Sequence, residues 1–364
     1  MRKKWWALLA GIAALALAGV GLWRSVLYRP DLAGGVARST VKLNGGKLTK
    51  AIDAEVAPTH FKGAILTIQK GQVTALRTYG YANADTKQPI TGDTLFPVAS
   101  MEKTMTGLLI AQLIREGKLN YTTKLSRFYP QISGADQVSI RELLNHTSGL
   151  AMDEIAPASE LKTDAAALAY TVREVSNTQQ KTFNYTNANF VLLAGIVDKI
   201  TGSDFYSVLK HRVLDPLHMT HTYDFDRIPK GSSVAEGYKY DGRDYVPEEL
   251  DRKLLSSLLG TGSLYMSIKD MATFQLALSD GRLLTRAQFQ ELTDKPDHDG
   301  NYSGGFFNVD ADTRLVVGQY DDFPNSFNTI FEAYNNNSAG VLMFANQFTD
   351  TDTKQMAEDI LDHL

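Results

Sequence analysis

The sequence predicts a mixed α/β fold of the α+β type, with an antiparallel β-sheet built from both chain ends and flanked by helices. β-rich runs occupy residues 63–83 and return after residue 300, and such runs bounded by turn residues are typical of strands. Helical patterns dominate residues 120–255. Strands at both ends with helices between them indicate one sheet that carries a helical subdomain as an insertion.

The N-terminal 28 residues have the pattern of a membrane anchor. Arg2, Lys3 and Lys4 precede nineteen uncharged residues, from Trp5 to Trp23, and a helix rising ~1.5 Å per residue over this length just crosses a bilayer core. All three tryptophans lie at the two ends of this run, where an aromatic belt places them. The sequence therefore predicts a single-pass protein of the cell membrane, with its N-terminus cytoplasmic and its main domain extracellular. A cleaved signal peptide is the alternative, because residues 16–18 offer a small-residue cleavage site.

The elements after the anchor follow in a clear order. We expect residues 29–44 to form a stalk and residues 45–364 to form one domain. A helix is predicted around residues 47–56, and Lys70-Gly71 splits the following β-rich run into a hairpin. The next helix lies within "PVASMEKTMTGLLIAQLI", residues 97–114, and Ser100 stands at the position of its N-cap.

The helical insertion, about residues 120–255, is marked by local helix signals. Ser139 and Glu142 have the spacing of a capping box, and two later helix-like runs end at residues 175 and 202, the second closed by Gly202. Three strand-like runs follow at residues 302–320, 327–335 and 338–346. Residues 352–364 are predicted to form a final amphipathic helix.

Composition excludes several classes of function. The chain has 364 residues, 43% of them hydrophobic, which is ample for a core. Residues 1–29 hold five basic residues and no acid, so 32 basic residues face 41 acidic ones in the remainder; an acidic body argues against nucleic acid as a partner. The absence of cysteine excludes a disulfide scaffold and a thiolate nucleophile. The seven histidines show no metal-ligand spacing, and we expect neither a metal nor a cofactor.

Lys103 has the wrong charge for its place at the start of a helix. It lies three residues after Ser100, where a capping box has Glu or Gln, and a cation in the first turn opposes the helix dipole at a cost of about 0.3–1 kcal/mol. The charge is explained if Lys103 must lose its proton, because serine is a weak nucleophile that needs a neighbouring base. The same spacing occurs at Ser39/Lys42, Ser159/Lys162 and Ser207/Lys210. Only Ser100 opens a strongly apolar helix directly after a β-rich segment.

A second candidate group lies on the loop before the helix that ends at Gly202. Tyr185 and Asn187 stand there in the stretch "TFNYTNANF". A tyrosine hydroxyl near Lys103 could relay protons, and an asparagine amide can grip a substrate carbonyl or amide. Without Ser100 and Lys103, Tyr185 would simply be a half-buried loop aromatic.

Taken in order, these segments resemble the serine β-lactamase and penicillin-binding-protein superfamily, in its class C and D-alanyl-D-alanine peptidase-like branch. The resemblance covers about residues 45–350, and its motifs are "LFPVASMEKTMTGLLIAQLIREGKL", "VSIRELLNHTSGL", "FNYTNANFVLLAGIVDKITG", "LDPLHMTHT" and "GTGSLYMSIKDMATF". It implies a β-lactamase/transpeptidase-like fold in which Ser100 is acylated, Lys103 is its partner and Tyr185 relays protons. Asn187 would orient the substrate, the Ser100 N–H would form half of an oxyanion hole, and His146 is interpreted as structural.

The third motif of the family departs from its usual pattern. No Lys-Thr-Gly, Lys-Ser-Gly or His-Thr-Gly occurs in the chain, and the matching stretch is "VVGQYDDFPNSFNTIFEAY". Gln319 then stands at the position of the cation and Asp321 at that of the glycine, with Asp322 beside it. In the family the cation helps to hold the carboxylate of a penicillin or of a terminal D-alanine, and the exchange favours a positively charged group instead. The alternative is that both acids form a solvated turn.

The resemblance and its departure lead to a hypothesis about function. A D-alanyl ester of teichoic acid has a free ammonium and no free carboxylate, so we expect a cell-envelope polymer of this kind as the substrate. The protein would then be a D-alanyl ester hydrolase. A DD-carboxypeptidase acting on peptidoglycan stem peptides is the main alternative. A β-lactamase, a general carboxylesterase and a non-catalytic cell-wall-binding relative are the others.

Overall fold

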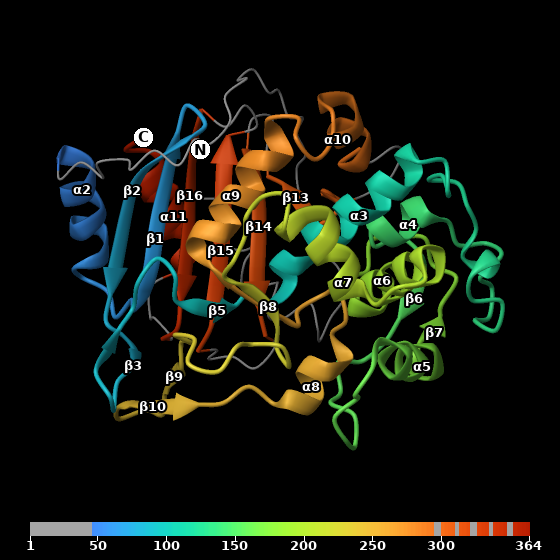
Figure 1. The fold of residues 1–364 in the computed structure, drawn as a ribbon, viewed down its shortest axis with the longest axis horizontal. Coiled ribbons are helices and arrows are strands. Elements are labelled where there is room, and N and C mark those ends of the chain that lie inside the picture. The colour runs from blue at the N-terminus through green and yellow to red at the C-terminus, as the bar shows by residue number, and fades with distance from the viewer. Residues whose placement is uncertain (1–45, 295–299, 310–312, 321–325, 335–337, 348–351) are drawn as a thin grey trace.

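The computed structural model describes residues 46–294, 300–309, 313–320, 326–334, 338–347 and 352–364 (Figure 1). The predicted anchor and stalk, residues 1–28 and 29–44, lie outside the described residues, as do Asp321 and Asp322. Within the described ranges no helix combines the length and the hydrophobicity needed to span a bilayer.

A seven-stranded antiparallel sheet forms the centre of the fold, in the order β12-β13-β14-β15-β16-β1-β2. Its strands are β1 (Gly63–Gln69), β2 (Gln72–Tyr79), β12 (Tyr302–Ser303), β13 (Phe306–Asn308), β14 (Thr313–Gln319), β15 (Asn328–Tyr334) and β16 (Ala339–Ala345). The N-terminal hairpin enters the sheet through β1, which pairs with β16 on one side and with β2 on the other. The prediction of an α+β fold with one antiparallel sheet built from both chain ends is therefore confirmed.

Helices cover both faces of this sheet (Figure 1). On one face α2 (Lys47–Val56) and α11 (Thr353–Leu361) pack over a hydrophobic cluster that includes Ile52, Met343 and Ile360. On the other face lie α9 (Ile268–Ser279) and the helical subdomain, over a larger cluster. The other helices are α3 (Lys103–Arg115), α4 (Ile140–Leu144), α5 (Asp164–Glu174), α6 (Asn187–Thr201), α7 (Phe205–Leu209), α8 (Arg252–Ser257) and α10 (Arg286–Leu292).

Short strands and turns connect these elements. The three-stranded sheet β5-β11-β8 matters most for the site, because it places β5 (Leu95–Pro97) beside β11 (Leu264–Ser267). The remaining short elements are η2 (Ala99–Glu102), η3 (Leu125–Arg127), η4 (Lys210–Leu214), β3 (Tyr81–Asn83), β4 (Gln88–Pro89), β6 (Leu150–Ala151), β7 (Ser176–Asn177), β8 (Thr222–Asp224), β9 (Gly237–Tyr240) and β10 (Tyr245–Glu248).

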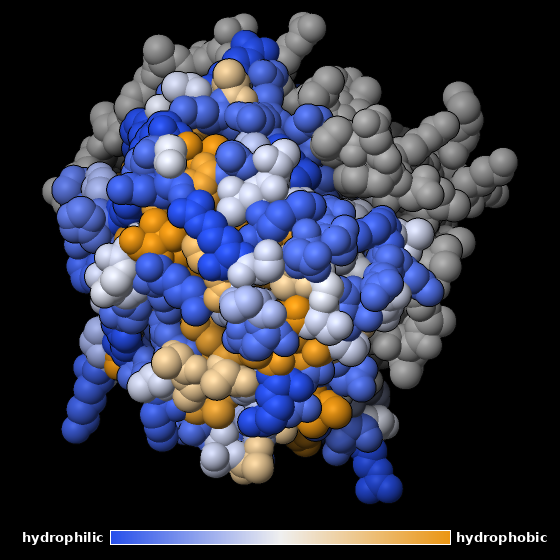
Figure 2. Space-filling model, turned by 90° about the vertical axis from the view of Figure 1, so that its right-hand side faces the viewer, coloured by the Kyte–Doolittle hydropathy of each residue, from blue (hydrophilic) through white to orange (hydrophobic). Residues whose placement is uncertain are grey.

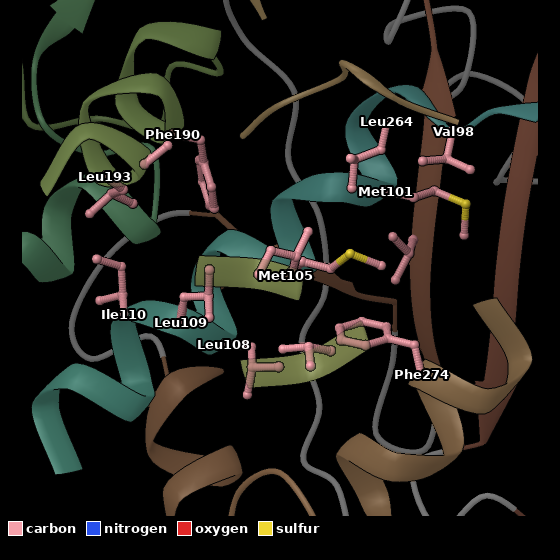
Figure 3. Packing of buried hydrophobic residues seen from close by; sticks show 14 of the residues in the cluster. Val98, Met101, Met105, Leu108, Leu109, Ile110, Phe190, Leu193, Leu264 and Phe274 are labelled. Carbon is pink, nitrogen blue, oxygen red and sulfur yellow. The ribbon is translucent and has the colours of Figure 1, made fainter. Parts of the chain in front are cut away.

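The helix α3 runs through the middle of the core. Every residue from Lys103 to Leu113 is buried, and Figure 3 shows Met105, Leu108 and Leu109 among side chains from the surrounding elements. A helix that is buried all round is typical of the centre of a large domain. The position of this helix is therefore fixed by packing rather than by its own terminal signals.

Local sequence signals account for several helix ends. Ser139 and Glu142 form the predicted capping box of α4, and Gly202 ends α6 with φ of +73°, in the left-handed region that favours glycine. Ser100 was wrongly predicted as an N-cap. It lies inside the 3₁₀ turn η2, while α3 begins at Lys103 without a side-chain cap.

The outer face of the helical subdomain is mainly hydrophilic. Figure 2 shows this side of the molecule, with small hydrophobic areas interspersed among hydrophilic side chains. Most of the apolar residues of α4, α6 and α7 are instead buried in the larger cluster. The subdomain thus shares one core with the central sheet.

Candidate active site

The turn that presents Ser100 is built from buried backbone. Strand β5 ends at Pro97, and the Val98 N–H donates a hydrogen bond of 3.0 Å to the carbonyl of Leu264. Ala99 follows with φ of +44°, a conformation that is strained for a residue with a Cβ. Ser100 is the only partly exposed residue between Thr94 and Leu113. The fold therefore exposes a single side chain at the start of its central helix.

Three predicted catalytic residues meet at the Ser100 hydroxyl. Lys103 Nζ lies 2.7 Å and the Tyr185 hydroxyl 2.9 Å from Ser100 Oγ. Lys103 is fully buried, and its Nζ also donates to the carbonyl of Thr261 at 3.3 Å and lies 4.9 Å from the centre of the Tyr185 ring. A serine hydroxyl in contact with two proton-transfer groups is the arrangement that an activated nucleophile requires.

His146 holds the tyrosine loop in place. Its carbonyl accepts the Asn184 N–H at 2.8 Å, its Nδ1 accepts the Thr186 N–H at 3.3 Å, and its ring lies 4.3 Å from that of Tyr185. Burial, and to a lesser degree the charge of Lys103, hold the pKa of His146 well below its usual value. A neutral imidazole with Nδ1 as acceptor fits these contacts, in agreement with a structural role.

The two predicted substrate-binding residues that are described come from different elements. Asn187 is the first residue of α6, and its Oδ1 is buried without a hydrogen-bond partner among the described residues. Gln319 is the exposed last residue of β14, opposite Asn328 of β15. Strand β14 packs against the turn of Ser100, since a Cβ added at Gly318 would come within 2.1 Å of the Val98 carbonyl oxygen. Asp321 and Asp322 lie outside the described residues.

Sequence reasoning missed two residues beneath the nucleophile. Glu102 is fully buried, and its Oε2 accepts the N–H groups of Ser263 and Leu264 at 2.6 and 3.1 Å. The Tyr320 hydroxyl donates to the carbonyl of Gly262 at 2.9 Å. An acid inside a mostly apolar stretch, next to Met101, was a usable signal for Glu102, whereas nothing local pointed to the Tyr320 contact. No three His, Asp or Glu side chains in the described part of the chain are grouped so as to hold a metal ion.

The sequence of most of the chain matches one protein family. The sequence pattern of the family described as Beta-lactamase matches residues 48–364. The chain belongs to the Beta-lactamase family. The expected membership of the serine β-lactamase and penicillin-binding-protein superfamily is thus confirmed, and with it the coarse assignment as a serine hydrolase of this family.

Two bacterial relatives share about a quarter of the sequence. Teichoic acid D-alanine hydrolase of Staphylococcus aureus is 26% identical over 302 residues, which are 82% of this chain and 73% of the relative. The putative penicillin-binding protein PbpX of Bacillus subtilis is 28% identical over 253 residues, 68% of this chain and 62% of the relative.

Solved structures support the fold. The crystal structure of FmtA from Staphylococcus aureus superimposes with a TM-score of 0.74 at 22% identity and covers 92% of both chains. D-amino acid amidase from Ochrobactrum anthropi SV3 gives a TM-score of 0.73 at 24% identity, over 87% of this chain and 98% of that one. These similarities confirm the β-lactamase/transpeptidase-like architecture.

Proposed function

We propose that this protein is a membrane-anchored serine hydrolase that removes D-alanyl groups from teichoic acid through an acyl-Ser100 intermediate. Residues 5–23 would anchor it, with the catalytic domain on the outer side of the membrane. The observation that carries the reaction class is the contact of Ser100 Oγ with both Lys103 Nζ and the Tyr185 hydroxyl. The likeness to teichoic acid D-alanine hydrolase supports the choice of substrate.

The reaction proceeds in two steps. Ser100 gives its hydroxyl proton to neutral Lys103 while Oγ bonds to the ester carbonyl carbon, and the Ser100 N–H stabilises the oxyanion. The bond from that carbon to the polymer oxygen then breaks, and this oxygen takes a proton relayed by Lys103 and Tyr185. Water attacks the D-alanyl-Ser100 ester in the second step and gives a proton to the same pair. The pair passes this proton to Ser100 Oγ as the acyl–oxygen bond breaks, which releases D-alanine and restores the Ser100 hydroxyl.

The third-motif position favours an ester over a peptide substrate. A terminal D-alanyl-D-alanine peptide carries a carboxylate that needs a cationic partner, and Gln319 has no charge to offer. The D-alanyl ester has no such carboxylate, so the uncharged Gln319 does not weaken its binding. The amide of Asn187, with its unpartnered Oδ1, is proposed to orient the D-alanyl group.

The proposal predicts D-alanine release by the purified full chain in detergent. D-alanylated lipoteichoic acid is the substrate, and free D-alanine is measured with D-amino-acid oxidase. Ser100→Ala is expected to lower the rate by about 10³-fold or more, because it removes the nucleophile. No release by the wild type, or equal release by the variant, would contradict the proposal. Labelling by fluorescent penicillin together with cleavage of a D-Ala-D-Ala peptide would favour the carboxypeptidase. The absence of any covalent adduct at Ser100 would favour a non-catalytic cell-wall-binding protein.

We further propose that Asp321 or Asp322 binds the substrate ammonium. A soluble D-alanyl ester is expected to lose about tenfold or more in kcat/KM when its amine is acetylated, since a hydrogen bond to a charged group contributes about 1.5–3 kcal/mol. The double variant Asp321→Asn/Asp322→Asn should remove most of this preference and leave turnover of the acetylated ester unchanged. An undiminished preference in the variant would instead assign both acids to a solvated turn.

A further inference from the structure

Every residue of the segment 260–264 makes a backbone hydrogen bond to η2, to α3 or to Tyr320. Its first three carbonyls accept hydrogen bonds and its last two N–H groups donate them. The pairs are Thr106 Oγ1 to Gly260 O at 2.6 Å, Lys103 Nζ to Thr261 O at 3.3 Å, Tyr320 OH to Gly262 O at 2.9 Å, and Ser263 N and Leu264 N to Glu102 Oε2 at 2.6 and 3.1 Å. This 260–264 segment therefore sets where the proposed base Lys103 rests.

Glu102 is the carboxyl group in this set, and only one of its oxygens is satisfied. The side chain is fully buried, and Oε1 has no hydrogen-bond partner among the described residues. A buried ionised carboxylate with an unpartnered oxygen is far more costly than a buried neutral acid. The geometry thus favours the protonated form, in which Oε2 accepts both N–H groups as a carbonyl oxygen does.

The charges around Glu102 act in opposite directions. Asp224 of β8 disfavours the charged form and adjacent Lys103 favours it, while Tyr320, directly after β14, also interacts electrostatically with Glu102. Ser263 also hydrogen-bonds to Asp224, so that two carboxyl groups share one serine. Burial, followed by Asp224, raises the pKa of Glu102 to about 8. Burial also raises the pKa of Asp224 to about 6.

We propose that Glu102 is a positioning residue of the acylation step that acts as an uncharged acid, holding the 260–264 segment against Lys103 without placing a carboxylate beside it. An ionised Glu102 would stabilise the ammonium of Lys103 and so withhold the base from Ser100. A neutral Glu102 does not stabilise the ammonium form, so Lys103 can act as the base. This inference rests on the proposed roles of Ser100 and Lys103, and it is independent of the identity of the acyl substrate.

Phosphonylation of Ser100 by a fluorophosphonate probe tests the inference in the full chain. The rate constant reports the nucleophilicity of Ser100, whose oxygen displaces fluoride, whatever the natural substrate. At about pH 7, Glu102→Gln is expected to react within about threefold of wild type, because its amide oxygen accepts the same two N–H groups. Glu102→Leu should lose about 30-fold or more, since it leaves both N–H groups without their acceptor and frees the 260–264 segment.

The pH profile separates the charge of Glu102 from its packing. Between about pH 7 and about pH 9.5 wild-type Glu102 ionises beside Lys103, so Glu102→Gln should gain about threefold or more over wild type. Asp198→Asn is the matched control. Burial raises the pKa of Asp198 to about 8 as well, but it lies three turns beyond Asn187 on α6, and its profile should follow wild type.

Either of two results overturns this inference alone. One is a loss of about 100-fold in Glu102→Gln at neutral pH, which would mean that a carboxylate is required. The other is a ratio of Glu102→Gln to wild type that does not change with pH, which would mean a purely structural side chain. A wild type that is not labelled at all overturns this inference together with the acylation chemistry. Labelling without D-alanine release overturns only the proposed substrate.

Discussion

Lys103→Met is expected to lower the acylation rate of Ser100 by about 10²–10⁴-fold, the usual contribution of general-base catalysis, while leaving the folded protein more stable. Lys103 is fully buried, and methionine has a similar length and shape without the amine. Burying an amine away from water costs the folded state several kcal/mol, a cost that the thioether of methionine does not carry. The lost hydrogen bonds to Ser100 Oγ and to the Thr261 carbonyl offset only about 1–3 kcal/mol of the gain.

Two measurements check this result together. Urea unfolding at neutral pH should show a free energy of unfolding higher by about 1–2 kcal/mol than that of wild type. Fluorophosphonate labelling should be almost absent. A variant that is both inactive and clearly destabilised would contradict the view that this lysine is kept for chemistry at the expense of stability.

Replacing Gly305 by alanine is expected to cost about 3–5 kcal/mol of stability and about 100-fold in acylation rate. Gly305 has φ of +102°, and an added Cβ would lie 2.6 Å from the backbone N and Cα of Thr104. Since these atoms belong to the first turn of α3, relieving the contact must move Lys103 relative to Ser100. Urea unfolding and fluorophosphonate labelling measure the two effects.

Gly117→Ala is the matched control for this variant. Gly117 also has a positive φ, +69°, but an added Cβ would meet nothing within 4 Å. Its replacement should therefore cost only about 1 kcal/mol of backbone strain and leave the labelling rate unchanged. Equal losses in both variants would show that backbone conformation, and not the close approach to α3, makes Gly305 necessary.

Much of the fold could be predicted because its signals are local. The hairpin at Lys70-Gly71, the capping box at Ser139 and the end of α6 at Gly202 depend on residues within a few positions of one another. The meeting of Tyr185 with Ser100 spans 85 residues, and no local pattern specifies it. That expectation came from the resemblance of the ordered motifs to a known family, whose tertiary fold brings these motifs together.

The framework beneath the nucleophile was missed for the same reason. Glu102 contacts the 260–264 segment across about 160 residues of chain, and no pattern within either segment indicates the other. Ser100 was interpreted as a cap because its neighbours have helical composition. The structure uses a strained Ala99 and a 3₁₀ turn there instead, and tertiary contacts override the local preference. The roles of Asp321 and Asp322 and of residues 1–28 stay predictions.

The pairing of β1 with β16 constrains the order in which the domain can assemble. Residues 63 and 345 face each other across this pair, so nearly the whole domain must be synthesised before β1 gains its second neighbour. Until then the β1–β2 hairpin presents an open edge of mostly apolar side chains, which invites pairing with other chains. Closure is slow where contacts are this distant in sequence. We therefore expect nascent chains that stop before β16 to aggregate through β1 rather than to fold into a smaller stable unit.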